Sequence, residues 1–212
     1  MPRLLGTYNV PGYVVDFTTD GDVAVTLDHQ PLSIEGSSYE DCQRKLPNGY
    51  WDSKSHCIGY QVSLERVKLS GNRAQVLDSV RADELAWSTP RRGDGRLFFG
   101  SGYYGGYLAD DVGYGYGWSW SSQQITVVDS TTLAHSSIEA PGVWSSVPSG
   151  MSLILAPSAG QPLTVIDGAD AEHPSLIEGD EAALGYTSHL AVSGKDVFLS
   201  QGDGGVQRLS LP

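Results

Sequence analysis

The sequence of 212 residues predicts an all-β fold, a β-propeller of four-stranded antiparallel blades. Three observations lead to this prediction. One phrase, in which an apolar strand, a polar turn with Gly and a second apolar strand follow one another, occurs four times. After each copy, alternating polar and apolar residues rich in Val, Ile and Thr mark further strands. No convincing amphipathic helix interrupts them, and repetition at this scale is typical of stacked or radially arranged units.

The repeated phrase supplies the first and second strands of each unit. Its four copies are Tyr13–Phe17 with Val23–Val25, Leu85–Trp87 with Leu97–Phe99, Val143–Trp144 with Leu153–Leu155, and Leu190–Val192 with Val197–Leu199. Each copy has a short turn that contains Gly21, Gly95, Gly150 or Gly194. Because glycine adopts the positive φ that tight hairpins need, we expect the two strands of each copy to be antiparallel neighbours.

Two more strands complete a unit. The predicted third strands are Tyr60–Leu64, Ile125–Asp129, Leu163–Asp167 and Val206–Ser210. The predicted fourth strands are Ala74–Leu77, Ala134–Ile138 and Ser175–Ile177. The last unit therefore lacks a fourth strand before the sequence ends at Pro212.

The N-terminal segment offers a strand for that last unit. Pro2–Thr7 reads like Pro174–Gly179, which contains a predicted fourth strand. In one interpretation this segment completes the last blade and closes a ring of four, which removes exposed sheet edges. In the other, the four blades are a section of a larger propeller, with further blades in the same native chain. An open β-sandwich is the third alternative.

The domain boundaries follow from this assignment. The blades span about 12–80, 83–139, 142–179, and 185–212 plus 2–8, with insertions at 28–59 and 100–124. Both insertions fall between the second and third strands of a unit. Successive connections of an up-and-down blade alternate between its two faces, so we expect both insertions to emerge on one face. Long insertions in compact domains often carry function.

Charge limits the partners that this protein can bind. Lys and Arg number 13 against 25 Asp and Glu, a net charge of -12. Such a surface repels phosphate backbones and anionic lipid, so we expect no nucleic acid partner. No segment approaches 18 consecutive apolar residues, so we expect no membrane insertion. The first residues lack the apolar core of a signal peptide, which leaves a cytosolic protein or a leader upstream in a longer chain.

The two cysteines favour export. Cys42 and Cys57 bracket the polar stretch Gln43–His56, for which the sequence predicts neither strand nor helix. A disulfide that closes about 15 residues would remove about 3 kcal/mol of entropy from the unfolded chain. This predicts a disulfide and an extracellular or cell-envelope location. The alternatives are two unrelated thiols, or zinc, for which His56 supplies only one further ligand.

The second insertion has an unusual composition. Its aromatic residues are Tyr103, Tyr104, Tyr107, Tyr114, Tyr116, Trp118 and Trp120, interleaved with glycines around Asp110 and Asp111. One interpretation is a β-hairpin with aromatic pairs across it. The other is a recognition surface for a protein or a glycan, because Tyr and Trp offer large contact areas at low entropic cost.

Further aromatic residues lie near the start of each first strand. They are Tyr13, Trp87, Trp144 and Tyr186. They pack between blades in one interpretation. In the other, they line the mouth of a central channel on the insertion face, where Trp87 and Trp144 add to the binding surface.

A family resemblance supports the fold. Leu163–Asp167, Asp170–Pro174, Leu190–Gly194 and Gly202–Val206 together resemble the LVIVD-type repeat of secreted bacterial β-propellers, and Ile125–Asp129 is a weaker copy. The chain is also similar to the C-terminal propeller domain family of bacterial secreted proteins. The resemblance is good over residues 160–212, fair over 1–28 and poor between them. It implies a propeller and an exported location, and it carries no catalytic signature.

Motifs for catalysis and cofactors are missing from the sequence. It has no Gly-x-Ser-x-Gly, His-Glu-x-x-His or Walker motif. The acidic groups around Gly21 and at Asp110 and Asp111 do not match an EF-hand. We therefore expect no cofactor, with calcium as the remaining alternative.

Three functions are compatible with these observations. The first is a non-catalytic binding or scaffold module of an exported protein that recognises a protein or glycan through an aromatic-rich face. The second is a polysaccharide-acting hydrolase or lyase that uses two axial carboxylates as acid and base. The third is a purely architectural section of a larger propeller.

Overall fold

The computed structural model describes most of the chain. The described residues are 7–18, 21–36, 38–46, 49–52, 56–85, 88, 90–101, 123–143, 145–157, 160–182, 189–201 and 204–212. Strands make up 62% of the structure and form four antiparallel sheets, so the predicted all-β class is confirmed. The chain divides into two compact units. Unit 1 comprises residues 1–87 and 130–133, and unit 2 comprises 88–129 and 134–212.

Unit 1 contains one sheet. Its strands are β1 (Tyr13–Phe17), β2 (Val23–Glu35), β3 (Tyr50–Asp52), β4 (His56–Ser70) and β5 (Arg73–Arg81). β1, β2, β4 and β5 pair in that order as an antiparallel meander, and β3 pairs with the other end of β4. A 3₁₀ turn, η1 (Asp83–Leu85), follows β5. Alternating side chains such as Val25, Leu27 and Leu64 are fully buried and form the core of this unit.

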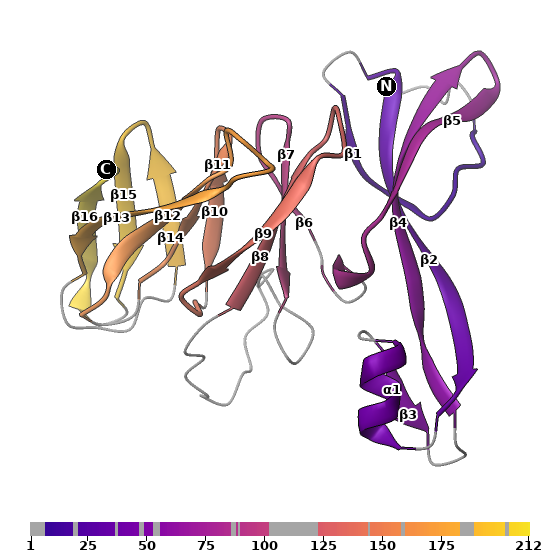
Figure 1. Cartoon of the computed structure of the whole chain (residues 1–212). Coiled ribbons are helices and arrows are strands. Elements are labelled where there is room, and N and C mark those ends of the chain that lie inside the picture. Colours follow the sequence, from indigo (N-terminus) through magenta and orange to yellow (C-terminus); the bar gives the residue numbers. More distant parts are fainter. Residues whose placement is uncertain are drawn as a thin grey trace. The chain divides into compact units, whose positions relative to one another are not determined.

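Two strands of unit 1 extend beyond the meander as an arm. β2 has 13 residues and β4 has 15, and they pair continuously from Val23–Lys68 to Glu35–His56. β1 pairs with β2 only up to Leu27, and β5 pairs with β4 only from Ser63 onward. The remaining half of each strand carries a short helix, α1 (Tyr39–Lys45), and β3 at its far end (Figure 1). We call the segment from residue 28 to residue 62 the arm.

The arm corrects one prediction. The sequence predicted neither strand nor helix for Gln43–His56, and no convincing amphipathic helix anywhere in the chain. The structure instead continues β2 to Glu35, forms α1 over Tyr39–Lys45 and starts β4 at His56. In its described residues, the predicted insertion is therefore a β-ribbon with a short helix at its tip.

Unit 2 contains three sheets. The first comprises β6 (Pro90–Arg92), β7 (Arg96–Ser101), β8 (Gln123–Asp129) and β9 (His135–Ala140). The second comprises β10 (Ser146–Ser149), β11 (Ser152–Leu155), β12 (Pro162–Asp167) and β13 (Ser175–Glu181). The third comprises β14 (His189–Ser193), β15 (Asp196–Ser200) and β16 (Val206–Ser210). Each sheet is a meander in which neighbours in sequence are neighbours in the sheet.

Two predicted first strands were placed too early in the sequence. Leu85–Trp87 was expected to be a strand, yet Leu85 ends η1 and the strand is β6. Val143–Trp144 was expected likewise, and the strand is β10. The reason is the hairpin turn. Tight turns pair the residues directly beside them, so β6 and β10 begin where the turn requires and not where the residues are most apolar.

The predicted glycine turns are confirmed. Gly21, Gly95, Gly150 and Gly194 all have positive φ, between 60° and 71°. Each lies between the first and second strands of its sheet. These turns fix the register of the four hairpins, and the strands that flank them in the first and fourth copies contain the predicted ones.

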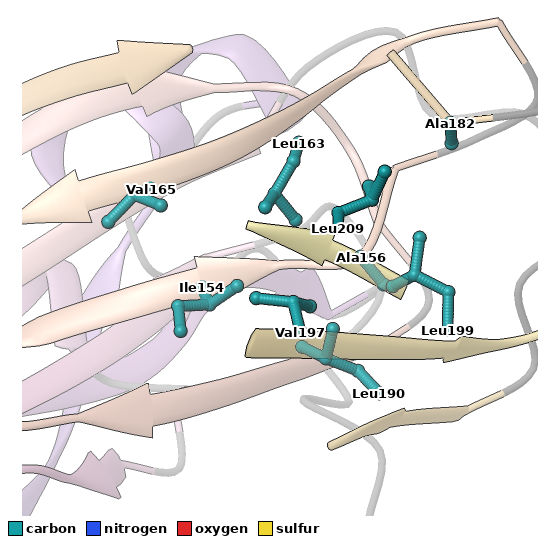
Figure 2. Packing of buried hydrophobic residues seen from close by; sticks show 9 residues of the cluster. All are labelled: Ile154, Ala156, Leu163, Val165, Ala182, Leu190, Val197, Leu199 and Leu209. Atoms are coloured by element: carbon teal, nitrogen blue, oxygen red, sulfur yellow. The ribbon is translucent and has the colours of Figure 1, made fainter. Parts of the chain in front are cut away.

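The sheets of unit 2 pack face to face in sequence order. One cluster of buried side chains, including Phe98 and Leu153, joins the first sheet to the second. Another joins the second sheet to the third, and its members point toward one another from both sheets (Figure 2). The strand β10 also lies beside both β6 and β14. The first strands of successive sheets are therefore adjacent.

Arg96 adds a polar link between the first two sheets. Its guanidinium group donates to the Asp129 carboxylate at 2.6 Å within its own sheet. It also donates to the carbonyl oxygens of Gly168 at 2.5 Å and Ala169 at 2.7 Å, both in the connection between β12 and β13. The side chains of Arg96 and Asp129 are only 12% and 18% exposed. With the Gly95 carbonyl oxygen at 2.9 Å, four acceptors thus converge on one side chain and join the two sheets.

The third sheet of unit 2 ends in an open edge. Among the described residues it has three strands, and β16 has no further neighbour. Val206 on this strand is 69% exposed. The segment predicted to pair here, residues 2–8, lies mostly outside the described residues, so its pairing stays a prediction.

Candidate functional site

The arm of unit 1 carries two groups of side chains that could serve a function. Its tip holds both cysteines. Its base, where the arm leaves the four-stranded part of the sheet, holds an aromatic cluster of Tyr13, His29 and Tyr60.

Local interactions explain why α1 forms at the tip. Ser38 is the N-cap, and its hydroxyl accepts a hydrogen bond from the Asp41 backbone N–H at 3.2 Å. The acidic residues of the first turn and the basic residues of the last turn complement the helix dipole. The Asp41 carboxylate also pairs with Arg44 and, at 2.8 Å, with Lys45. Lys45 in turn donates to the Glu35 carbonyl at 3.1 Å, which ties the helix to the end of β2.

The two cysteines meet under this helix. Cys42 of α1 and Cys57 of β4 lie 2.6 Å apart as free cysteines, and both are fully buried. Gly36 packs directly on them, because a Cβ at this position would overlap the sulfur of Cys57. Leu46, which is only 3% exposed, completes the small core. The pair therefore lies at the centre of the tip.

The environment makes the Cys42 thiol unreactive. Burial is the largest factor that raises the pKa of Cys42 to about 11, and the neighbouring Cys57 and Asp41 raise it further, while Lys45 opposes them. The thiolate is the reactive form, so this thiol is protonated and shielded at neutral pH. A catalytic or redox-sensing cysteine needs the opposite properties, and we infer a structural role for the pair.

The aromatic cluster lies at the base of the arm. The rings of Tyr13 and His29 stack with centroids 5.6 Å apart and an interplanar angle of 13°. Tyr60 meets His29 edge to face, also at 5.6 Å. Strand register explains the cluster: Tyr13 pairs with Leu27 and Tyr60 with Pro31, so period-2 alternation puts all three rings on one face of the sheet.

Part of this cluster faces solvent. Tyr13 is 46% exposed, and burial of the remainder raises the pKa of its hydroxyl. Of the three residues, the sequence drew attention only to Tyr13, as one of the aromatics near the first strands, and did not assign it to the predicted binding surface. His29 and Tyr60 were missed because β2 was expected to end before the insertion. Extending the alternation of Val25 and Leu27 by one more step would have found His29.

The predicted aromatic surface of the second insertion lies outside the described residues. This holds for Tyr103, Tyr104, Tyr107, Tyr114, Tyr116, Trp118 and Trp120, and also for Trp87, Trp144, Asp110 and Asp111. The described strands on either side nevertheless fix where this insertion is attached. β7 and β8 pair as far as Ser101 with Gln124, so residues 102–122 leave and rejoin the sheet at adjacent positions. The arm of unit 1 occupies the same connection of its own sheet.

Other acidic and histidine side chains have structural contacts or lie in exposed connections. Asp83 accepts hydrogen bonds from the Val62 backbone N–H at 2.9 Å and from Arg81 at 2.6 Å. It therefore anchors η1 to the sheet. Asp170 and His173 are in contact at 3.1 Å in the exposed connection after β12, and His173 is the main cause of a lowered pKa of Asp170. Over the described ranges, no group of three or more His, Cys, Asp or Glu could hold a metal ion.

Comparisons with family models, curated proteins and solved structures found no match to this chain. In the described part of the chain, no helix has the length and apolar character that crossing a membrane requires.

Proposed function

We propose that this protein is a non-catalytic binding module that recognises a glycan or a protein through aromatic side chains. The observation that carries the proposal is the Tyr13–His29–Tyr60 cluster. Its three rings are in contact, and Tyr13 at one end is almost half exposed. Aromatic faces of this kind stack on sugar rings and anchor protein partners. The cluster lies where the first long excursion leaves its sheet.

The uneven length of the connections supports this proposal. In the first two sheets the connection between the second and third strands is long: the arm in one, residues 102–122 in the other. In the last two sheets the same connection is short, spanning residues 156–161 and 201–205. Short connections suffice for the fold, so the long ones serve another purpose. Their aromatic content points to recognition.

Affinity electrophoresis in gels that contain neutral polysaccharides tests the glycan form of this proposal. We expect retarded migration with at least one β-linked polysaccharide. Tyr13→Ala with Tyr60→Ala, and separately Trp118→Ala with Trp120→Ala, should each weaken retention about tenfold, because lost stacking contacts are worth about 1–2 kcal/mol. Tyr8→Ala, which removes an exposed tyrosine outside the cluster, serves as the control.

Thermal unfolding of the same variants separates binding from packing. A pair of substitutions that lowers stability without any change in retention would show that those rings only pack against the body of the protein. If no polysaccharide retains the wild type, the remaining form of the proposal is recognition of a protein. Cross-linking of the full chain in its native extract, with the same variants, tests that form.

For the architecture, we propose that the four sheets are blades of a β-propeller that belongs to an exported protein. The stacking of successive sheets in unit 2, with their first strands adjacent, supports this proposal, as does the LVIVD-type resemblance. In the closed form, the segment 2–8 adds the missing fourth strand beside β16. In the alternative form, the four sheets are a section of a larger propeller, and further blades of the native chain lie beside β16.

Removal of residues 1–8 tests the closure. We expect faster amide exchange along β16 and its partner β15, together with concentration-dependent association, because an unpaired edge recruits other strands. The exchange of β10–β13 should change little. Unchanged exchange in β16 after the truncation would show that another segment, or none, covers this edge.

We also propose that Cys42 and Cys57 form a disulfide in the mature protein. In this step the two thiols lose their hydrogens to a small disulfide oxidant, which is reduced to two thiols, and one S–S bond links α1 to β4. Because both sulfurs are buried, the exchange takes place as the tip folds. A bridge of this kind fits an oxidising, exported location.

A further inference from the structure

A polar row crosses the sheet of unit 1 on one face. Thr26 of β2 lies directly opposite Glu65 of β4, and Glu65 lies opposite Ser79 of β5. Asp28 follows Thr26 by two positions on β2 and therefore projects from the same face. Side chains directly opposite in an antiparallel pair have Cβ atoms about 5 Å apart, so these oxygen-bearing groups are close neighbours.

Two oxygen atoms in this row are buried without a partner. The hydroxyl of Thr26, a fully buried residue, has no hydrogen-bond partner among the described residues, and neither has Oε2 of Glu65. The other Glu65 oxygen accepts from the Ser79 hydroxyl at 3.5 Å. Buried polar atoms are almost always satisfied, and each one left unsatisfied costs about 1–3 kcal/mol. The described protein atoms therefore leave two acceptor oxygens of this row unsatisfied.

The row also lacks compensation for its negative charge. Burial and then the Asp28 carboxylate raise the pKa of Glu65, and only the Ser79 hydroxyl opposes them. Asp28 accepts one neutral hydrogen bond, from Gln30 at 3.1 Å. Arg81 lies on the same face of β5, but its guanidinium pairs with Asp83. Two carboxylates on neighbouring strands thus project from one face in diagonal positions, and neither forms an ion pair with a described basic side chain.

We propose that Thr26, Asp28 and Glu65 form an oxygen-only binding site for a divalent cation of the calcium type. Carboxylate and hydroxyl oxygens are hard ligands, which Ca²⁺ prefers. A cation neutralises both carboxylates and occupies the two unpartnered oxygens at once. A proton on Glu65 would neutralise only one of them.

The expected affinity is modest. The side chains supply fewer oxygens than the six to eight that Ca²⁺ takes, so water molecules complete the shell. Sites of this type in extracellular modules bind with dissociation constants of about 0.1–1 mM. The site lies within unit 1, so its effect is on the stability of this unit.

Calcium titration of the full chain tests the site. After chelator treatment, thermal unfolding at pH 7 is followed with and without about 10 mM calcium chloride at matched ionic strength. We expect the wild-type midpoint to rise by about 3 to 8 °C. Glu65→Gln should abolish the rise and, because it removes a buried charge, should also make the calcium-free protein more stable. Thr26→Val, which keeps the shape of the side chain, should weaken calcium binding.

Two controls make the result decisive. Glu139→Gln on β9 is exposed and changes the net charge equally, and it should keep the full response to calcium. No response of the wild type, or an equal response of Glu65→Gln, would overturn the proposal. A calcium-independent gain in stability when the pH falls from 7 towards 4 would identify a proton as the occupant, because the raised pKa of Glu65 means that ionisation destabilises the folded state.

Discussion

Replacing both Cys42 and Cys57 with alanine is expected to lower the stability of the arm tip by about 3 kcal/mol, the contribution of a bridge that closes about 15 residues. The effect should be local, because the tip has its own small core around the two sulfurs. Amide exchange in α1 should therefore accelerate by about 100-fold, while β14 and β15 should keep their protection. Mass spectrometry with a thiol-specific label, applied to the denatured protein without reductant, should find no free thiol in the wild type.

The single variants distinguish a bridge from two separate thiols. A disulfide requires both partners, so Cys42→Ala, Cys57→Ala and the double variant should lose nearly equal stability. Independent buried thiols would give losses that add. Two labelled thiols per chain in the denatured, non-reduced protein would contradict the bridge outright.

Replacing Arg96 with alanine is expected to destabilise unit 2 by about 2–4 kcal/mol. The substitution leaves the largely buried Asp129 carboxylate without its cation. It also leaves the carbonyl oxygens of Gly168 and Ala169 without the donor that joins the first and second sheets. Urea unfolding followed by circular dichroism measures the loss as a lower midpoint.

The chain contains a matched control for Arg96. Arg208 pairs with Asp196 at 2.7 Å, but this pair is 67% and 30% exposed and lies within one sheet. Arg208→Ala should cost less than about 1 kcal/mol, since exposed ion pairs contribute little. Arg96→Lys keeps the charge without the planar fork, so it should restore only part of the stability. Equal losses for Arg96→Ala and Arg208→Ala would show that the link between the sheets is energetically unimportant.

The strands beside Gly21 and Gly194 could be predicted from the sequence, whereas the first strands beside Gly95 and Gly150 were placed too early. Gly194 fixes the hairpin of the last sheet, and the predicted strands Leu190–Val192 and Val197–Leu199 lie within β14 and β15. Val206–Ser210 matches β16 residue for residue. Local turn chemistry and alternation act over a few residues, so sequence patterns report them well.

The arm could not be predicted because tertiary pairing holds it. Beyond Leu27, β2 continues through polar residues and Pro31, which break the usual strand pattern. β4 pairs with this segment all along, and β1 no longer does, so an edge position tolerates the proline. α1 was missed because its seven residues are too few for periodicity, and its buried side offers only two apolar residues, Cys42 and the C-cap residue Leu46.

The candidate sites were predicted in part. Composition drew attention to Tyr13 and to the two cysteines, and the structure brings the cysteines together. Composition did not reveal His29, Tyr60 or the Thr26–Glu65 row. These neighbours lie on different strands, and only the strand register brings them together. The same holds for Arg96, whose acceptors Gly168 and Ala169 lie more than 70 residues away in the chain.

The contrast between long and short second-to-third strand connections has a practical consequence for engineering. In two of its sheets this protein already tolerates large excursions at that connection, while the hairpin turns and buried clusters stay in place. The equivalent connections at residues 156–161 and 201–205 are therefore natural positions for grafting foreign peptides or epitopes. A display scaffold built in this way would present its cargo from a framework whose folding information lies elsewhere in the chain.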